Sequence, residues 1–256
     1  MILLEGRALA KRYGSVQALA GVDISVSAGQ IVGLIGPNGA GKSTAFRLLA
    51  GTEVPDAGSV WLQGSDVTRW PLHRRARAGV AYLAQQPSVL PRLTVRQNLL
   101  IAIEASSSGC LVDQILADSD LSELQGRLAG QLSGGERRLL EIARARAIKP
   151  AILLFDEPFS GVDPAHVTDL QARIRAMADE GIGVLLTDHA ARAALAICDS
   201  VYLLDCGVVQ VSGTSTAVAA DKNARARYLG HDFCLDWRLQ DRGVAYNGDE
   251  SGDSRG

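Results

Sequence analysis

A glycine-rich segment, Gly36–Ser43, constrains the fold of this chain more than any other feature. Its sequence, GPNGAGKS, fits the pattern G-x-x-x-x-G-K-[ST], in which the glycines let consecutive backbone N–H groups point at phosphate oxygens. An unbroken apolar run, Ile31–Ile35, precedes the segment, and a stretch with helical periodicity, Lys42–Ala50, follows it. A buried strand, a tight turn and a helix in this order predict a phosphate-binding loop at the carboxyl edge of a parallel sheet.

Other segments complete an α/β pattern. Two further apolar runs, Ala151–Phe155 and Gly183–Leu186, also end next to acidic or histidine residues, as expected of parallel strands that carry functional side chains. Val22–Val26 alternates apolar and polar residues, which predicts a half-buried antiparallel strand, and Cys206-Gly207 is predicted to be a hairpin turn. We therefore predict an α/β fold with an antiparallel β subdomain and a helical insert at about residues 86–145.

The residue types at these strand ends suit phosphate chemistry. Lys42 would supply positive charge to the β- and γ-phosphates of a nucleotide, and the Ser43 hydroxyl would coordinate Mg²⁺. At the end of the run Ile152–Phe155, Asp156 would reach the Mg²⁺ shell and Glu157 the water that attacks the γ-phosphorus. The alternative is that the two carboxylates are only solvent-exposed residues at the end of a strand. The phosphate loop upstream argues against this alternative.

A second glycine-bearing segment, Leu132–Glu136, has the sequence LSGGE and precedes an amphipathic run, Arg137–Ile148. The simple interpretation is a helix that starts with Ser133 as its N-cap and a glutamate three residues later. Two consecutive glycines, Gly134 and Gly135, are nevertheless costly unless something must approach the backbone closely. An anion at the helix N-terminus is such a ligand.

Lying between the two nucleotide motifs, LSGGE resembles the signature sequence of the ABC ATPase family. In that family, which has the P-loop NTPase fold, each ATP lies between the phosphate loop of one subunit and the signature motif of the other. The resemblance covers roughly residues 1–235, an ABC ATP-binding domain, and implies an ATP-hydrolysing homodimer, or a closely related heterodimer, with ATP and Mg²⁺ as ligands. We expect residues 236–256 to form a tail that is disordered at its end, and His231–Trp237 to pack at the far end of the dimer or simply to tie down the C-terminus.

The resemblance assigns roles residue by residue. Tyr13 resembles the aromatic residue that stacks on adenine, and Gln85 the glutamine that senses Mg²⁺ and the transmembrane partner. Asp163 resembles the aspartate of the loop that crosses the dimer interface, and His189 the switch histidine at the γ-phosphate. The implied catalytic residues are Glu157, His189 and Gln85, and the implied metal ligands are Ser43, Gln85 and Asp156. The implied nucleotide-binding residues are Tyr13, Gly36, Pro37, Asn38, Gly39, Ala40, Gly41, Lys42, Ser43, Thr44, Ser133, Gly134, Gly135 and Asp163.

Less universal stretches resemble one subgroup of the family, the ATPase subunits of bacterial lipopolysaccharide export transporters. These stretches are Pro71–Gly79, Tyr82–Gln85, Arg92–Val95, Asn98–Leu99, Gly135–Arg138, Asp156–Pro164 and Tyr228–Gly230 followed by Phe233. The subgroup implies two copies beneath two transmembrane permease subunits, contacted near Gln85–Arg92, at the cytoplasmic face of the bacterial inner membrane. Leu90 and Pro91 stand where the subgroup commonly has an aromatic and a basic residue, in this same segment.

Two alternative functions stay open. An importer ATPase of the branched-chain amino-acid type has closely overlapping motifs. A soluble ABC ATPase of DNA repair or translation would carry a long coiled-coil insertion or a second nucleotide domain, and neither is found in this sequence.

Composition limits the partners further. The formal net charge of -2 provides no basic field for nucleic acid, and no apolar stretch approaches the roughly 18 residues that span a bilayer. We expect a cytoplasmic protein that reaches the membrane only through its partners. Its scattered cysteines suit reduced thiols. The basic run Arg69, His73, Arg74, Arg75 and Arg77 is interpreted as a solvated helix face, with a membrane-facing or nucleic-acid patch as the alternative.

Overall fold

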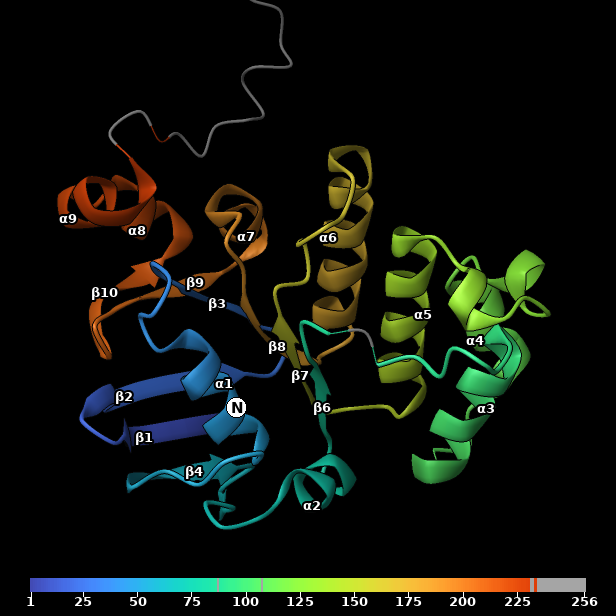
Figure 1. Cartoon of the computed structure of the whole chain (residues 1–256), viewed down its shortest axis with the longest axis horizontal. Coiled ribbons are helices and arrows are strands. Elements are labelled where there is room, and N and C mark those ends of the chain that lie inside the picture. The colour runs from blue at the N-terminus through green and yellow to red at the C-terminus, as the bar shows by residue number, and fades with distance from the viewer. Residues whose placement is uncertain (87, 107, 231–232, 234–256) are drawn as a thin grey trace, which may run out of the picture.

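Two β-sheets form the centre of the protein, seen in a computed structural model that describes residues 1–86, 88–106, 108–230 and 233 (Figure 1). The smaller sheet is antiparallel and has the strand order β2-β1-β4-β5. Its strands are β1 (Ile2–Tyr13), β2 (Val16–Ser27), β4 (Ala57–Leu62) and β5 (Ser65–Asp66). In β2, Val22, Ile24 and Val26 are buried and Asp23 is exposed, so the predicted half-buried antiparallel strand is confirmed.

The larger sheet has six strands in the order β10-β9-β3-β8-β7-β6. Its strands are β3 (Ile31–Ile35), β6 (Val80–Leu83), β7 (Ile152–Asp156), β8 (Gly183–Thr187), β9 (Ser200–Asp205) and β10 (Val208–Thr214). All neighbours pair in parallel except β9 and β10. Every residue of β3, β7 and β8 is buried, because helices or the smaller sheet cover both faces. The predicted α/β class is therefore confirmed.

The helices divide between the two faces of this sheet. They are α1 (Lys42–Ala50), α2 (Leu72–Arg77), α3 (Val95–Ser106), α4 (Val112–Asp118), α5 (Gly134–Ala147), α6 (Pro164–Asp179), α7 (Ala191–Ile197), α8 (Ser215–Ala220) and α9 (Lys222–Ala224), with short turns η1 (Ser122–Leu124), η2 (Ala129–Gln131) and η3 (Arg225–Leu229). Helix α1 lies between the two sheets, where Phe46 packs in one core with Leu4 of β1 and Leu34 of β3. Helices α5, α6 and α7 pack against the opposite face, in a core that contains Phe155 and Ile174. No helix of the described residues is long and apolar enough to cross a bilayer.

A separate core joins helices α3, α4 and α5, which stand to one side of the sheets in Figure 1. Leu99, Leu116 and Leu140 contribute one buried side chain from each helix. The helical character expected between about residues 86 and 145 is thus present in the described part of that stretch. The domain limits at 235 and 236 stay predictions, and residues 234–256, with the expected tail contacts of Leu235 and Trp237, lie outside the described residues.

The hairpin between β9 and β10 turns at the predicted position. Cys206 (φ 48°) and Gly207 (φ 76°) both have the left-handed backbone that a two-residue hairpin loop requires. The Gly207 N–H donates to the carbonyl oxygen of Ala40 at 3.0 Å. This hairpin, which comes much later in the sequence, therefore supports the glycine-rich loop through that hydrogen bond.

The interpretation of the basic run as a solvated helix face is wrong for Arg75. Arg69, His73, Arg74 and Arg77 are exposed, but the Arg75 side chain is 0 % exposed. Its guanidinium donates to backbone carbonyl oxygens of α1 and of the loop before α2. The physical reason is that the last carbonyls of a helix have no partner inside the helix and, when buried, need donors from elsewhere.

Candidate nucleotide-binding site

The glycine-rich loop joins β3 to α1 and depends on glycine at two close approaches. A Cβ atom at Gly36 (φ 149°) would lie 2.0 Å from the carbonyl oxygen of Leu204. One at Gly41 (φ 107°) would lie 2.4 Å from that of Ala18. Helix α1 has no side-chain N-cap and no acidic residue in its first turn. Its N-terminal N–H groups and its positive dipole end therefore suit a phosphate group held by the predicted residues Gly36–Thr44.

Lys42 lies at the base of this loop with its charge directed inward. Its Nζ donates to the carbonyl oxygens of Gly36 at 2.7 Å and Pro37 at 2.9 Å. Burial lowers the pKa of Lys42, while the charges of Glu157 and Asp156 act in the opposite direction. The structure thus brings the predicted phosphate-binding cation into the field of the two predicted carboxylates.

Asp156 ends β7 as a buried carboxylate. The Oη of Tyr82, on the neighbouring strand β6, donates to Asp156 Oδ2 at 3.2 Å. Burial raises the pKa of Asp156, and burial together with the Asp156 charge raises the pKa of Tyr82 to about 12. Sequence reasoning gave no role to Tyr82, because its pairing with the end of β7 depends on strand order and register.

Glu157 is the point at which three distant segments meet. Its carboxylate accepts a hydrogen bond from Gln85 Nε2 at 2.7 Å and contacts His189 Nε2. Its backbone is left-handed (φ 54°), an unusual state for a residue with a side chain, and its N–H donates to the Thr187 carbonyl oxygen at 2.8 Å. The Glu157 side chain is 9 % exposed and that of His189 is 50 % exposed. The three predicted catalytic residues are therefore neighbours, with the carboxylate at the inner position.

Asp188 fixes the loop after β7 to the loop after β8. Its side chain is almost fully buried; Oδ2 accepts from the Phe159 N–H and Oδ1 from the Ala190 N–H, both at 2.8 Å. These bonds set the position of Glu157 relative to His189. Sequence reasoning assigned no role to Asp188, although its place at the end of a buried apolar run was a usable signal.

Tyr13 ends β1 beside the phosphate loop. Its ring is 41 % exposed, its hydroxyl contacts the Glu53 carboxylate, and Glu53 Oε1 lies 2.9 Å from Arg47 Nη1 of α1. Burial, followed by this contact with Glu53, raises the pKa of Tyr13. An aromatic face held next to the first turns of α1 suits stacking by a nucleobase. Glu53 was not singled out from the sequence.

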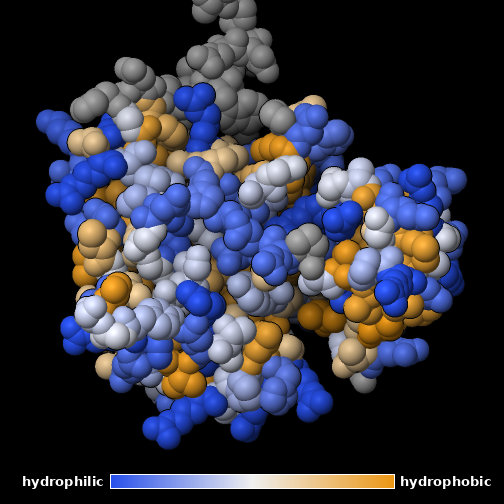
Figure 2. Space-filling model, in the orientation of Figure 1, coloured by the Kyte–Doolittle hydropathy of each residue, from blue (hydrophilic) through white to orange (hydrophobic). Residues whose placement is uncertain are grey.

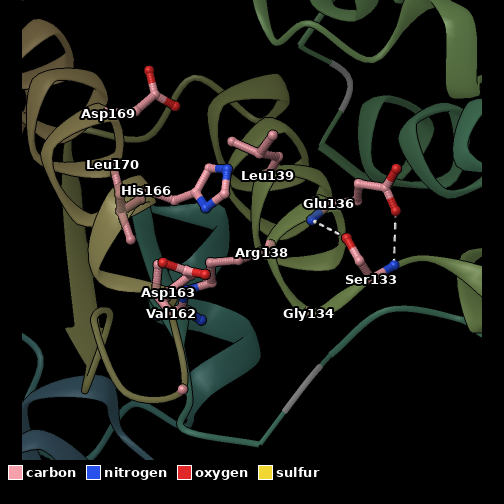
Figure 3. Close-up of a pocket in the computed structure, with 12 residues that line it drawn as sticks. Ser133, Gly134, Glu136, Arg138, Leu139, Val162, Asp163, His166, Asp169 and Leu170 are labelled. Carbon is pink, nitrogen blue, oxygen red and sulfur yellow. Dashed lines mark hydrogen bonds between the residues drawn. The ribbon is translucent and has the colours of Figure 1, made fainter.

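A second hollow, of about 400 Å³, lies between α5 and α6 (Figure 3). Ser133 caps α5 by a reciprocal pair of bonds: its N–H donates to Glu136 Oε2 at 2.7 Å, and the Glu136 N–H donates to Ser133 Oγ at 3.2 Å. Asp163 caps α6 by accepting from the Ala165 N–H at 2.9 Å. The predicted residues Ser133, Gly134, Gly135 and Asp163 all line this hollow.

The phosphate loop and this hollow are separate parts of one chain. None of the described residues that line the hollow belongs to Gly36–Thr44. Leu154 of β7 points into the core around α1, and its neighbour Phe155 into the core around α5 and α6. The structure therefore brings the predicted site residues together as two separate groups in one chain.

This arrangement of strands, phosphate loop and capped glycine pair defines an ATP-binding cassette. The profile of the family described as ABC transporter matches residues 19–160. The chain is 39 % identical over 241 residues to the lipopolysaccharide export system ATP-binding protein LptB of Escherichia coli strain K12, covering 92 % of this chain and 100 % of that protein. It is 41 % identical over 236 residues to LptB of Acidithiobacillus ferridurans, covering 90 % and 98 %.

A solved structure shares this architecture. The crystal structure of the ADP conformation of MJ1267, an ATP-binding cassette of an ABC transporter, matches with a TM-score of 0.81 and 30 % sequence identity over 90 % of this chain and 99 % of that one. The chain belongs to the ABC transporter family, as an ATP-hydrolysing cassette that binds nucleotide. The family resemblance of its motifs is confirmed, whereas the role of each site residue stays a prediction.

We predict that Asp156→Asn stabilises the nucleotide-free protein at neutral pH. The pKa of Asp156 lies above its ordinary value of 3.8 because burial disfavours the charge. The folded state therefore holds the carboxylate less favourably than the unfolded chain does, and this penalty disappears as pH falls through the folded pKa to below 3.8. Urea unfolding should show a gain for Asp156→Asn at about pH 7 that shrinks toward about pH 4.

The matched control is Asp118→Asn on the exposed surface of α4, which should change the free energy of unfolding by less than about 0.5 kcal/mol. A loss of stability in Asp156→Asn at about pH 7 would contradict the assigned cause of the pKa shift.

Proposed function

We propose that the chain hydrolyses ATP held at Gly36–Thr44, with Glu157 orienting and polarising the attacking water. The observation that carries this proposal is the Glu157 carboxylate, held between Gln85 and His189. A carboxylate fixed in this way accepts a hydrogen bond from the water while the water oxygen attacks the γ-phosphorus and the bond to the β-phosphate oxygen breaks, giving ADP and phosphate. Lys42 and the N-terminus of α1 stabilise charge on the phosphate oxygens.

The donor set beside this carboxylate fits Mg²⁺. The Ser43 hydroxyl, the Asp156 carboxylate and the Gln85 amide oxygen would hold the ion, and all three are oxygen donors of the kind that Mg²⁺ prefers. Asp156 is a buried carboxylate for which Tyr82 donates the side-chain hydrogen bond, so a cation would relieve its burial. When bound, Mg²⁺ neutralises charge on the β- and γ-phosphates.

Substitution of the proposed base should separate binding from turnover. Glu157→Gln should keep ATP binding and slow hydrolysis by roughly 10²–10⁴-fold, the usual contribution of a positioned general base. Steady-state phosphate release and equilibrium binding of labelled ATP measure the two quantities. Glu53→Gln, at the Tyr13 contact, is the control and should keep its turnover within about threefold, because its carboxylate does not face the water. Near-normal hydrolysis by Glu157→Gln would remove Glu157 from its role.

We further propose that two copies of the chain form a head-to-tail dimer around two ATP molecules. What supports this is the separation of the site residues within one chain into two groups, the phosphate loop and the hollow, that have no lining residue in common. In the dimer, Ser133 and the N-terminus of α5 of one subunit face the γ-phosphate held by Lys42 of the other. Asp163 lies at the crossing between the subunits, and Tyr13 stacks on the adenine.

Mixing two inactive variants tests the dimer. Lys42→Ala and Ser133→Arg should each abolish turnover in the homodimer. A mixed dimer of one of each keeps one complete site, so an equimolar mixture should recover about a quarter of the wild-type activity if subunits exchange randomly. No recovery in a mixture shown by tag-specific purification to contain mixed dimers would contradict the head-to-tail arrangement.

We propose lipopolysaccharide export as the transport process, supported by 39–41 % identity to LptB over 90–92 % of the chain. In this proposal two transmembrane permease subunits bind near Gln85–Arg92, and the protein reaches the cytoplasmic face of the bacterial inner membrane only through them. A groove beside this segment supports the docking of a partner helix. It is lined by residues of α2, β6, α3 and α5, among them Leu83, Ala102 and Glu141.

Purification of the tagged protein from its native membrane in detergent tests this assignment. Mass spectrometry should identify two related transmembrane chains with large periplasmic domains. The charge reversal Arg92→Glu should reduce their recovery at least tenfold, whereas Lys222→Glu on α9 should not, because Lys222 is exposed and α9 does not line the groove. Recovery of many-helix permeases would instead assign the protein to an importer. Recovery of no membrane protein would assign it a soluble function.

A further inference from the structure

Arg75 is a fully buried cation that is satisfied by backbone oxygens. Its Nη1 donates to the carbonyl oxygens of Leu48 and Leu49, each at 2.7 Å. Its Nε donates to the Trp70 carbonyl oxygen at 3.0 Å and its Nη2 to that of Thr68 at 3.1 Å. Burial lowers the pKa of Arg75 to about 10, so the guanidinium stays charged at neutral pH. One side chain thus ties together two segments that the sequence separates by some twenty residues.

The first of these segments is the end of the phosphate-binding helix. Leu48 and Leu49 lie in the last turn of α1, where carbonyl oxygens lack partners inside the helix and the helix dipole is negative. Arg75 supplies both donors and charge at this end. The opposite end of the same short helix carries the phosphate loop, so a shift imposed at Leu48 and Leu49 is carried along the helix to Lys42.

Close approach of the guanidinium to α1 depends on Gly51. This residue is the C-cap of α1, with a left-handed backbone (φ 82°). A Cβ atom at Gly51 would lie 2.7 Å from Arg75 Nε and 2.7 Å from the Trp70 carbonyl oxygen. The Gly51 carbonyl oxygen also accepts from the Leu72 N–H at 2.9 Å, which places the start of α2 against the end of α1.

The second segment leads into a wall of the partner groove. Leu72, His73, Ala76 and Arg77 of α2 line the groove of about 920 Å³ that lies between the sheets and the helical insert. Figure 2 shows the surface hollowed between the main body of the molecule and the lobe that contains α3 and α4. Arg75 extends from the same helix into the interior, toward α1. Helix α2 therefore has the groove on one side and the phosphate-binding helix on the other.

We propose that Arg75 is a positioning residue that couples α2, a wall of the groove, to α1 and its phosphate loop. The proposal rests on the proposed function, since it takes the loop to bind ATP. A helix docked in the groove would displace α2, and the bonds of Arg75 would pass that displacement to α1. By reciprocity, nucleotide at the loop must change the stability of α2. This connection is separate from the one through Gln85 and Glu157, which reaches the site at the end of β7.

Hydrogen exchange of the full chain, with and without the non-hydrolysable analogue AMP-PNP and Mg²⁺, measures this coupling directly. In the wild type, nucleotide should slow exchange of the α2 amides by about five- to tenfold, the size of ordinary inter-site coupling. In Arg75→Lys, which keeps the charge but cannot make four directed bonds, the effect on α2 should fall below about twofold, although α1 is still protected. Arg69→Gln, an exposed arginine in the loop before α2, should behave as the wild type.

Kinetics distinguish a positioning role from simple support of the fold. Arg75→Lys should raise the KM for ATP by about three- to tenfold with kcat nearly retained, because ground-state binding is weakened. A residue that only stabilises the fold would lower the unfolding temperature and leave both KM and the α2 response unchanged. If Arg75→Lys does not fold, the wild type alone decides, because bound AMP-PNP that leaves exchange of the α2 amides unchanged overturns the coupling.

The outcomes separate the two proposals. Equal nucleotide protection of α2 in the wild type and Arg75→Lys would overturn the coupling while leaving ATP binding intact. A wild type that binds no AMP-PNP by calorimetry would instead overturn the proposed function. Protection of α2 that disappears in Arg75→Lys and persists in Arg69→Gln supports the coupling.

Discussion

The burial of α1 between two sheets is the constraint on which the rest of the structure depends. Phe46, Leu48 and Leu49 are wholly inaccessible, and each fully buried side chain of this kind contributes about 1.5–3 kcal/mol. The helix has no access to bulk water along its last turn, Leu48–Ala50, whereas Ser43 in its first turn is exposed beside the glycine-rich loop. Its N-terminal N–H groups therefore open onto a loop that only glycine can form at Gly36 and Gly41, and its last carbonyl oxygens need buried donors. Phosphate binding at one end and a buried arginine at the other follow from the same packing.

The central sheet determines which parts of the site a single chain can bring together. Side chains of a strand alternate between faces, so β7 directs Leu154 toward α1 and Phe155 toward α5 and α6. Residues at the ends of strands are not confined to one face of the sheet. Asp156 and Glu157 therefore lie near the phosphate loop at the carboxyl edge. The capped glycines at the start of α5 line the separate hollow beside α6. The topology thus explains why the motifs, adjacent in function within the family, lie apart in the subunit.

The sequence was sufficient for every feature that follows from local pattern. Buried runs predicted the parallel strands, and the acidic pair after one run predicted the place of Glu157, whereas the role of His189 came from the family resemblance. It was not sufficient where a role depends on which strands are neighbours or on which helix end is buried. Tyr82 reaches Asp156 through the pairing of β6 with β7, and Arg75 looks in the sequence like its exposed neighbours. Both assignments need the tertiary structure, because the sequence around each residue looks the same as that around a residue with no role in the site.

The site also holds unfavourable local states that the surrounding structure maintains. Glu157 occupies a left-handed backbone conformation without being glycine, and Asp156 is a carboxylate whose burial disfavours its charge. Neither state would persist in an isolated loop. Asp188 fixes the chain on both sides of this region by accepting two backbone N–H groups, and Tyr82 supplies a hydroxyl to Asp156. These supports come from β6 and from the loop after β8. A displacement of either element must therefore alter the position of the two carboxylates, so a movement at the edge of the sheet can reach the site.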